Sequence, residues 1–527
     1  MRMRSSKAPW YALALMAGGA ILRCVHLFSI PMDAPFHLGG LFYEFSRQII
    51  QNNFALPETI PFYSLGGIPF AYPPLGFYLQ AVVMKLFTLP PFVTVNLLPP
   101  LIATLTLPAF YWMIKGQTDN NRLRTLALFT FAFMPSAFVN QIEGAGLAEA
   151  CGTLVLLLYL GWLFRFEKDP HPAPTLWAGI FLGLCVLSSP GSAYGSVIIS
   201  ILYLFKFLGQ DLKKRSYMRP ALLVLTGLTG LLVSAPYWLM VIRNHEFGVF
   251  TTTFLTQQDV ASLLNQIRYM ITFKPADMIT FVSDEGIYGF LFDWLIFAGL
   301  IWAVLNKQGF QVAIFLSVWL IPREGSWLVA IPAAWLAALG IVHLVWPLLQ
   351  NAFSTSGANN RPPLAPGLLA LILVLLIVAG SVNSLNDLKN QAELQISTAA
   401  VETLRHERQN IPTGEHVIVA GNGALREWAP ALLEREVLNC EFGLEWQPAE
   451  LQQVYLINDA LDANDLVTAM IVVRAYSGDS RLWLIGDPDQ VAKLAADAGP
   501  TLEITIQEQT PELVFALIQP KTHSWKD

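Results

Sequence analysis

Long apolar segments recur along most of this chain and limit its fold more than any other feature. A helix needs about 20 apolar residues to cross a bilayer, and about eleven segments reach or approach that length. The chain is therefore predicted to be an α-helical polytopic membrane protein. Its 13% charged residues are few beside the roughly 25% of soluble proteins. The segments lie at residues 9–30, 92–114, 126–141, 144–164, 176–190, 191–207, 220–241, 287–305, 310–322, 326–349 and 368–384.

The first apolar segment is predicted to be retained as a helix. Arg2, Arg4 and Lys7 precede an apolar run that continues to about residue 30. A secretory signal has the same order of charges and apolar residues. This run is long for a signal, however, and many further spans follow it.

Basic residues in short loops predict the orientation, because such loops stay in the cytoplasm. The apolar piece at 74–88 is short for a span and is predicted to be a half-buried helix at the outer surface. The N-terminus is then cytoplasmic, and residues 1–385 form a transmembrane domain with outer loops at 31–91 and 243–286. The basic clusters are Arg2/Arg4/Lys7, Lys115/Arg122/Arg124, Arg165/Lys168 and Lys213/Lys214/Arg215/Arg219.

Residues 386–527 are predicted to form a soluble α/β domain outside the cytoplasm. Short β-rich runs alternate there with helical stretches, and acidic residues become frequent. Gly421-Asn422-Gly423 follows a predicted strand but lacks the third glycine of a dinucleotide site, so a turn is expected. The predicted strands are His416–Ala420, Ala469–Arg474, Leu482–Ile485, Leu502–Gln507 and Leu513–Ile518, and the predicted helices lie near Leu425–Arg435 and Asp489–Ala498.

Two classes of binding site find no support in the sequence. No dense basic stripe with interleaved aromatic residues is present, so no nucleic-acid partner is expected. Cys24, Cys151 and Cys185 lie in apolar runs and Cys440 lies alone in the soluble part. Their spacing fits neither a disulfide framework nor a zinc site.

The first outer loop holds the leading catalytic candidate, Asp33, directly after the first helix. Ionisable groups at the membrane boundary are functional candidates, although a helix cap or a solvated loop acid is the alternative. His37 follows four residues later and would share a helix face with Asp33 if this stretch were helical. Tyr72 precedes two prolines, which open helices well, so Tyr72 is either a substrate contact or an interfacial aromatic residue.

Two further acids lie at the next outer turn. Glu143 follows an apolar segment, and Glu149 lies inside the helix after it. Either could be the partner of Asp33, since an acid within a span usually faces a cavity. The alternatives are a loop acid for Glu143 and an interior ion pair with Arg23 for Glu149.

Three basic residues at the outer side are candidates for substrate binding. Arg323 ends a helix at headgroup depth, where its guanidinium could bind a phosphate with two parallel hydrogen bonds. A snorkelling arginine or a pair with Glu324 is the alternative. Arg243 and His245 begin the second outer loop. One histidine and one nearby acid are weak evidence for a metal, so the metal is left unknown, with a divalent cation as one option.

These pieces, in this order, resemble the GT-C glycosyltransferases, which use lipid-linked sugars. Members include protein O-mannosyltransferases, aminoarabinose transferases and oligosaccharyltransferases. The likeness rests on Asp33 after the first helix, on an aromatic-Pro-Pro-Leu-x-x-Tyr helix entry at 72–78, on Met134-Pro135 before an acidic loop, and on an Arg-x-x-x-Trp-x-x-x-x-Pro-Ala run at 323–333. The family commonly has a second acid at the first position, where this chain has Ala34.

The resemblance implies an enzyme that moves a sugar, with inversion, from a polyprenyl-phosphate donor to an acceptor. It places the reaction at the outer face of a bacterial plasma membrane, among membrane lipids. Asp33 or Glu143 would act as the base, and Arg323, with His37 or Arg243, would bind the phosphate. Two alternatives stay open: a transporter or flippase for a lipid-linked substrate, and a non-catalytic GT-C-like scaffold.

Overall fold

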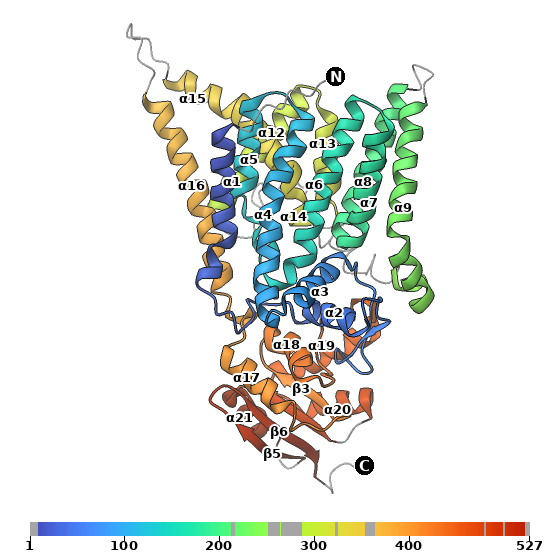
Figure 1. Cartoon of the computed structure of the whole chain (residues 1–527). Coiled ribbons are helices and arrows are strands. Elements are labelled where there is room, and N and C mark those ends of the chain that lie inside the picture. The colour runs from blue at the N-terminus through green and yellow to red at the C-terminus, as the bar shows by residue number, and fades with distance from the viewer. Residues whose placement is uncertain are drawn as a thin grey trace.

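A computed structural model describes residues 9–211, 217–250, 264, 287–321, 325–353, 364–478, 481–498 and 501–521. Its long helices run side by side as a bundle, and a smaller domain with a sheet lies beyond one end of that bundle (Figure 1). We call the end that faces this domain the outer end, and the end at which α1 begins the inner end. The bundle helices are α1 (Trp10–Cys24), α4 (Pro91–Gln117), α5 (Asn121–Phe133), α6 (Leu147–Lys168), α7 (Pro172–Ser188), α8 (Pro190–Asp211), α9 (Met218–His245), α12 (Ile287–Leu305), α13 (Gly309–Trp319), α14 (Gly325–Gly340), the π-helical turn η6 (Ile341–Val345), α15 (Trp346–Phe353) and α16 (Leu364–Lys389).

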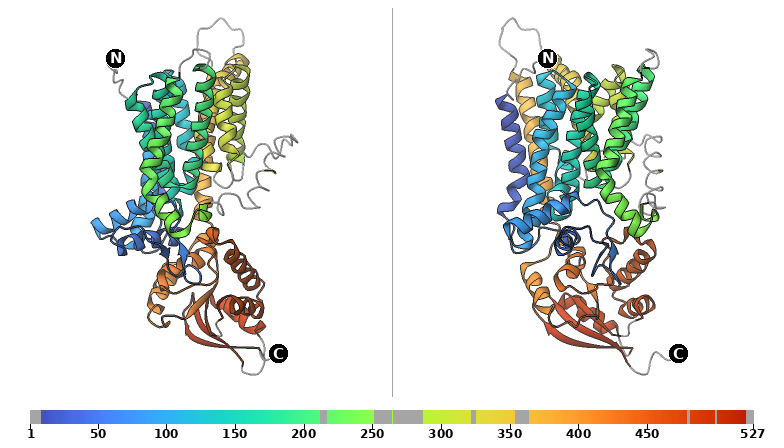
Figure 2. Two further views of the ribbon diagram at one scale, coloured as in Figure 1. Left: turned by 90° about the vertical axis from the view of Figure 1, so that its right-hand side faces the viewer. Right: turned by 45° about the vertical axis from the view of Figure 1, so that its right-hand side comes forward.

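The predicted class of an α-helical polytopic membrane protein is confirmed. Each of the apolar segments predicted from the sequence contains a helix. Within the described residues, seven helices are long and apolar enough to cross a membrane, and a bent pair raises the number to eight. The described apolar parts of α7, α12 and α13 are shorter, at 10–17 residues. They stand in the bundle beside the longer helices (Figures 1 and 2).

Small residues let the bundle helices approach closely, as membrane helices require. A Cβ atom at Gly299 of α12 would lie 1.8 Å from the carbonyl oxygen of Leu336 on α14. A Cβ atom at Gly161 of α6 would lie 2.0 Å from the ring of Trp112 on α4. These two helix pairs therefore depend on glycine at the contact.

The first outer loop folds over the outer end of the bundle (Figure 1). It contains η1 (Val25–Phe28), α2 (Gly40–Gln51), the paired strands β1 (Thr59–Ile60) and β2 (Ile68–Pro69), and α3 (Leu75–Phe87). Helix α3 has 13 residues, and both α2 and α3 lie across the ends of the long helices (Figure 2). The segment 74–88 is thus a short helix outside the set of long parallel helices.

The C-terminal domain is built on a four-stranded sheet in the order β3-β4-β6-β5. Strands β3 (His416–Ala420) and β4 (Leu482–Gly486) are parallel, and β6 (Val514–Pro520) pairs antiparallel with both β4 and β5 (Leu502–Gln509). Its helices are η7 (Ala392–Leu394), α17 (Thr398–Glu407), α18 (Gly423–Leu433), η8 (Leu444–Trp446), α19 (Pro448–Asp462), α20 (Leu466–Ser477) and α21 (Pro488–Asp497).

One predicted strand of this domain is wrong. Residues 469–474 belong to α20, although their β-branched side chains favour a strand. Leu466, Ala469, Met470 and Val473 are buried, which is the three-and-four spacing of one helix face. Asp465 caps the helix by accepting the Thr468 N–H at 2.9 Å. Packing and capping outweigh β-propensity here.

Helix α5 breaks sharply, and a buried arginine satisfies the broken end. The helix ends at Phe133, and the chain then turns by 84° into Pro135–Gln141, because proline cannot continue the hydrogen-bond ladder. Arg23, which is fully buried, donates to the carbonyl oxygens of Ala132 at 2.9 Å and Phe131 at 3.5 Å. The Ser381 hydroxyl donates to the Phe133 carbonyl. Side chains thus replace the missing backbone donors.

The broken end gives a test of stability. We expect Arg23→Leu to destabilise the bundle by about 3 kcal/mol, because buried carbonyl groups lose their donors. Unfolding by SDS in mixed micelles measures this loss. The matched control is Lys168→Leu, whose side chain is exposed at the inner end of α6. Equal stability of the parent and Arg23→Leu would contradict the assigned role.

The predicted orientation can be tested by labelling at the two ends. Tyr455 is 52% exposed in the C-terminal domain, and Lys307 is exposed between α12 and α13 at the inner end. In intact spheroplasts, an impermeant maleimide should label Tyr455→Cys, whereas Lys307→Cys should react only after lysis. The reverse pattern would place the C-terminal domain in the cytoplasm.

Candidate functional site

The outer end of the bundle brings together two side chains that the sequence singled out. His37 Nδ1 lies 3.3 Å from Glu143 Oε2, although 106 positions separate the two residues. The His37 side chain is fully buried and that of Glu143 is 15% exposed. The other ring nitrogen of His37, Nε2, has no hydrogen-bond partner among the described residues. The pair therefore combines a reachable carboxylate with a histidine that can orient it.

Backbone contacts between two loops hold this pair in place. The Ala145 N–H, two residues after Glu143, donates to the Leu38 carbonyl at 3.0 Å. Gly39 has φ +137°, and a Cβ atom there would lie 2.8 Å from the Gly144 carbonyl carbon. Glycine is required for both reasons. The His37 loop and the Glu143 loop are thus packed backbone against backbone.

The stretch that carries His37 is not helical, so His37 and Asp33 do not share a helix face as the sequence suggested. His37 has φ +62°, a left-handed conformation that non-glycine residues rarely adopt. The neighbouring Phe36 N–H donates to Asn96 Oδ1 of α4 at 2.8 Å. The Phe36 ring stacks on His37 at 4.1 Å and on His26 at 4.9 Å. The ring stack and the hydrogen bond to Asn96, rather than a helix, therefore fix the position of His37.

The C-terminal domain supports the same loop through two adjacent residues of α18. Buried Glu427 accepts the Gly39 N–H at 2.8 Å and the Leu41 N–H at 3.4 Å. Its carboxylate therefore caps the N-terminus of α2, where negative charge is favoured. The neighbouring Trp428 donates its indole N–H to the His37 carbonyl at 2.9 Å. The domain thus holds both ends of the His37–Leu41 segment.

Burial changes the protonation of this carboxyl group. Removal from water raises the pKa of Glu427 to about 7, although the N–H groups of residues 39–41 act against the shift. The charge of Glu143 adds to the increase. The contact between the C-terminal domain and the first outer loop therefore contains a carboxyl group, that of Glu427, with a pKa near neutral pH.

Asp33 is exposed at the start of the same loop. Its Oδ1 accepts the Thr398 hydroxyl of α17 at 3.3 Å. This carboxylate is open to water, and Thr398, its hydrogen-bond donor, belongs to the C-terminal domain. No hydrogen bond or ion pair within the described residues links it to Glu143.

The other predicted residues of this end lie around the pair. Tyr72 is half-buried and packs against Phe42 and Phe77 at ring distances of 5.3 and 5.7 Å. Glu149 lies half-buried in the first turn of α6. The hydrogen bonds of Arg23 go to backbone carbonyls rather than to Glu149.

Of the three predicted basic residues, the structure describes Arg243 and His245. Arg243 is exposed near the outer end of α9. His245 Nε2 lies 2.8 Å from the Glu58 carbonyl oxygen, so it ties α9 to the first outer loop. Arg323 lies outside the described residues, as does most of the second outer loop, so the structure says nothing of their placement.

A metal site is not formed by the described side chains. Among them, no group of three or more His, Cys, Asp and Glu residues could hold a metal ion. His37 and Glu143 supply two ligand types that zinc accepts, but a protein site usually needs three or four.

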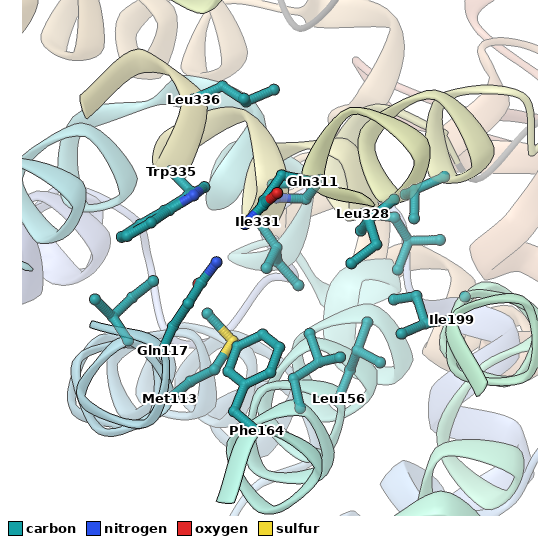
Figure 3. Close-up of a pocket in the computed structure, with 16 residues that line it drawn as sticks. Met113, Gln117, Leu156, Phe164, Ile199, Gln311, Leu328, Ile331, Trp335 and Leu336 are labelled. Atoms are coloured by element: carbon teal, nitrogen blue, oxygen red, sulfur yellow. The ribbon is translucent and has the colours of Figure 1, made fainter. Parts of the chain in front are cut away.

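Two cavities in the bundle lie away from this pair. The smaller one, of about 50 Å³, has almost entirely apolar walls. Gln117 and Trp335 point into it from α4 and α14, and Gln311 of α13 lies beside them (Figure 3). The larger one, of about 1000 Å³, lies between α1, α5 and α16. Met113, Ile114 and Gln117 from the inner half of α4 line the smaller cavity. Residues of α5 between Asn121 and Phe129 line the larger one, whereas His37 lies at the outer end of the bundle.

No protein-family model matches the chain, and no curated protein sequence is significantly similar to it. Solved structures do match. Aminoarabinose transferase ArnT from Cupriavidus metallidurans, bound to undecaprenyl phosphate, superposes with a TM-score of 0.57 at 14% identity over 97% of this chain and 98% of its own. This chain has the GT-C fold.

Two other GT-C structures extend the comparison. Archaeal oligosaccharyltransferase AglB from Archaeoglobus fulgidus, in complex with an inhibitory peptide and a dolichol-phosphate, gives a TM-score of 0.59 at 13% identity. The match covers 98% of this chain and 75% of AglB. Arabinofuranosyltransferase AftD from Mycobacteria gives 0.51 at 13% identity, over 98% of this chain and 42% of AftD. The GT-C resemblance predicted from the sequence is confirmed at the level of the fold.

Sequence reasoning missed the supports of the GT-C outer loop. Asn96 is a buried polar residue within an apolar helix. A polar residue in such a segment could have indicated its role from the sequence. Glu427 and Trp428 lie side by side in a helix whose side chains are almost all buried. A buried acid in such a helix must find donors, but the sequence cannot say that they lie 388 positions earlier.

The raised pKa of Glu427 predicts the pH dependence of the domain contact. A carboxyl group with a folded pKa near 7 and an ordinary value of 4.5 binds its proton more tightly in the folded state. Its contribution to stability is complete below pH 4.5 and is lost as the pH rises to about 7. Thermal unfolding should show this decline in the parent and a flatter profile in Glu427→Gln. Exposed Glu402→Gln, the matched control, should keep the parent's slope; an unchanged slope in Glu427→Gln would refute the assignment.

Proposed function

We propose that the chain is a membrane glycosyltransferase that moves a sugar from a polyprenyl-phosphate donor to an acceptor at the outer face. Two similar structures, ArnT and AglB, hold undecaprenyl phosphate and a dolichol-phosphate. Fold likeness alone does not assign an activity. The observation that carries the proposal is the His37–Glu143 contact at 3.3 Å, at the same end of the bundle as Asp33.

The chemistry needs a base and a group that stabilises the leaving phosphate. The acceptor oxygen attacks the anomeric carbon, the bond from that carbon to the phosphate oxygen breaks, and the hydroxyl proton goes to a carboxylate. Glu143 is the better placed base, because its side chain is partly exposed and His37 fixes one of its oxygens. A carboxylate held in one orientation reaches the acceptor hydroxyl with less entropic cost.

Two other outer residues take supporting roles in this proposal. Asp33 is exposed and held by Thr398, so it can contact the acceptor from the aqueous side. Exposed Arg243, near the outer end of α9, can attract the phosphate of the donor. A guanidinium suits this task because it stays charged and offers paired donors. Arg323 keeps the role predicted from the sequence.

The proposal includes the C-terminal domain in the catalytic unit. Trp428 and Glu427 bind the segment on which His37 lies, and Thr398 binds Asp33. Without these contacts the positive φ at His37 would lose part of its support. The domain is thus a positioning element for the outer loop.

The base is tested by removing its charge. We expect Glu143→Gln to lower sugar transfer by about a hundredfold or more, the usual loss for a general base. Membranes that hold the protein are given a panel of polyprenyl-phosphate sugars and a cell-envelope fraction as acceptor. Release of polyprenyl phosphate, followed by mass spectrometry, gives the rate. The control Glu402→Gln should keep the parent's rate.

A parallel Asp33→Asn variant separates the two carboxylates. A hundredfold loss in this variant, with normal transfer by folded Glu143→Gln, would make Asp33 the base. Normal transfer by both variants would contradict catalysis at this site. Absence of transfer by the parent with every donor would contradict the glycosyltransferase itself.

A further inference from the structure

The inner end of the bundle contains a cavity of about 1000 Å³, far from the candidate site. It lies between α1, α5 and α16 and beneath the turn that joins α14 to α15. In Figure 1 these elements meet at the end opposite the C-terminal domain. Pockets that hold small ligands have volumes of about 300–1,000 Å³. The cavity is therefore large enough for part of a lipid.

The cavity has an apolar interior and a polar rim. Leu126, Phe129 and Val374 line its walls, whereas Asn121, Arg122 and Gln350 supply polar groups. Asn121 and Arg122 belong to the first turn of α5 and are both exposed. This is the arrangement that fits an amphiphile, with hydrocarbon inside and a polar headgroup at the helix end.

The charge at the rim is available for an anion. The nearby Arg124 donates to Asp119 at 2.8 Å. Arg122, by contrast, forms no ion pair among the described residues, and its backbone N–H donates to Asn120 Oδ1 at 3.0 Å. An exposed guanidinium beside an apolar cavity complements an anionic headgroup.

Two further features of the lining favour a lipid at this depth. Trp10, Tyr11 and Trp346 line the cavity, and such aromatic side chains are typical of the membrane–water interface. Ile341, Val342 and Val345 also line it, and they belong to the π-helical turn η6. Single π-helical turns occur frequently at functional sites.

We propose that this cavity binds one anionic phospholipid from the inner leaflet, with an acyl chain among the apolar walls and the phosphate at Arg122. The proposal is independent of the glycosyltransferase function, since its residues lie at the other end of the bundle. The lipid would fill the space between α1, α5 and α16 at the inner end.

Lipid retention on the purified protein tests the site. The protein is exchanged from micelles that contain equal amounts of phosphatidylglycerol and phosphatidylcholine, and native mass spectrometry counts the bound lipids. We expect the parent to retain one phosphatidylglycerol in preference to phosphatidylcholine. Arg122→Gln should lower that retention about fivefold, which corresponds to about 1 kcal/mol per basic residue at an anionic lipid. Lys307→Gln, the control at the same end but outside the cavity, should change nothing.

Filling the cavity separates this site from lipids on the outer surface of the bundle. Ala370→Trp on α16 and Ala14→Trp on α1 both place a large ring in the cavity, and either should abolish the retained lipid. Two variants on different helices guard against one that misfolds. Equal retention by Arg122→Gln and the parent, or undiminished retention in both folded tryptophan variants, would overturn the proposal. So would retention only after removal of residues 2–7, because the chain's own N-terminus would then be the occupant.

Discussion

The candidate site depends on a buried arginine in the last turn of α1. Arg23 supplies the donors that the last carbonyls of α5 lose at Pro135. Because those carbonyls are satisfied, α5 can stop early and the chain can cross the outer end in short helical turns. Those turns carry Glu143 to His37. A straight α5 would carry the following residues along the bundle axis, away from the first outer loop.

Much of this architecture could be predicted from the sequence. The lengths of the apolar segments identified the spans. The segment at 74–88 was distinguished from them because it is short. The α/β character of the C-terminal part followed from alternating patterns, except at residues 469–474, where β-branched residues belong to a helix. Position at the membrane boundary selected both His37 and Glu143, which the structure places 3.3 Å apart.

The residues that could not be predicted from the sequence share one physical property. Asn96, Glu427 and Trp428 act through hydrogen bonds to backbone groups far away in the sequence. Any backbone can accept or donate such a bond, so no residue pattern at the other end reveals the partner. The prediction that Asp33 and His37 share a helix face was wrong for the same reason. Contacts from α4 and α18 hold that loop in a bent path with positive φ angles at His37 and Gly39, which local periodicity does not predict.

The link between Glu427 and Gly39 joins positions 388 residues apart, and this separation has a consequence for biogenesis. Synthesis proceeds from the N-terminus, so the first outer loop emerges long before the helix that caps it. During that interval every helix of the bundle can enter the membrane while the loop around His37 lacks its cap. The protein would acquire its competent outer surface only in the final stage of assembly. A chain truncated before α18 would insert normally and yet remain an immature precursor.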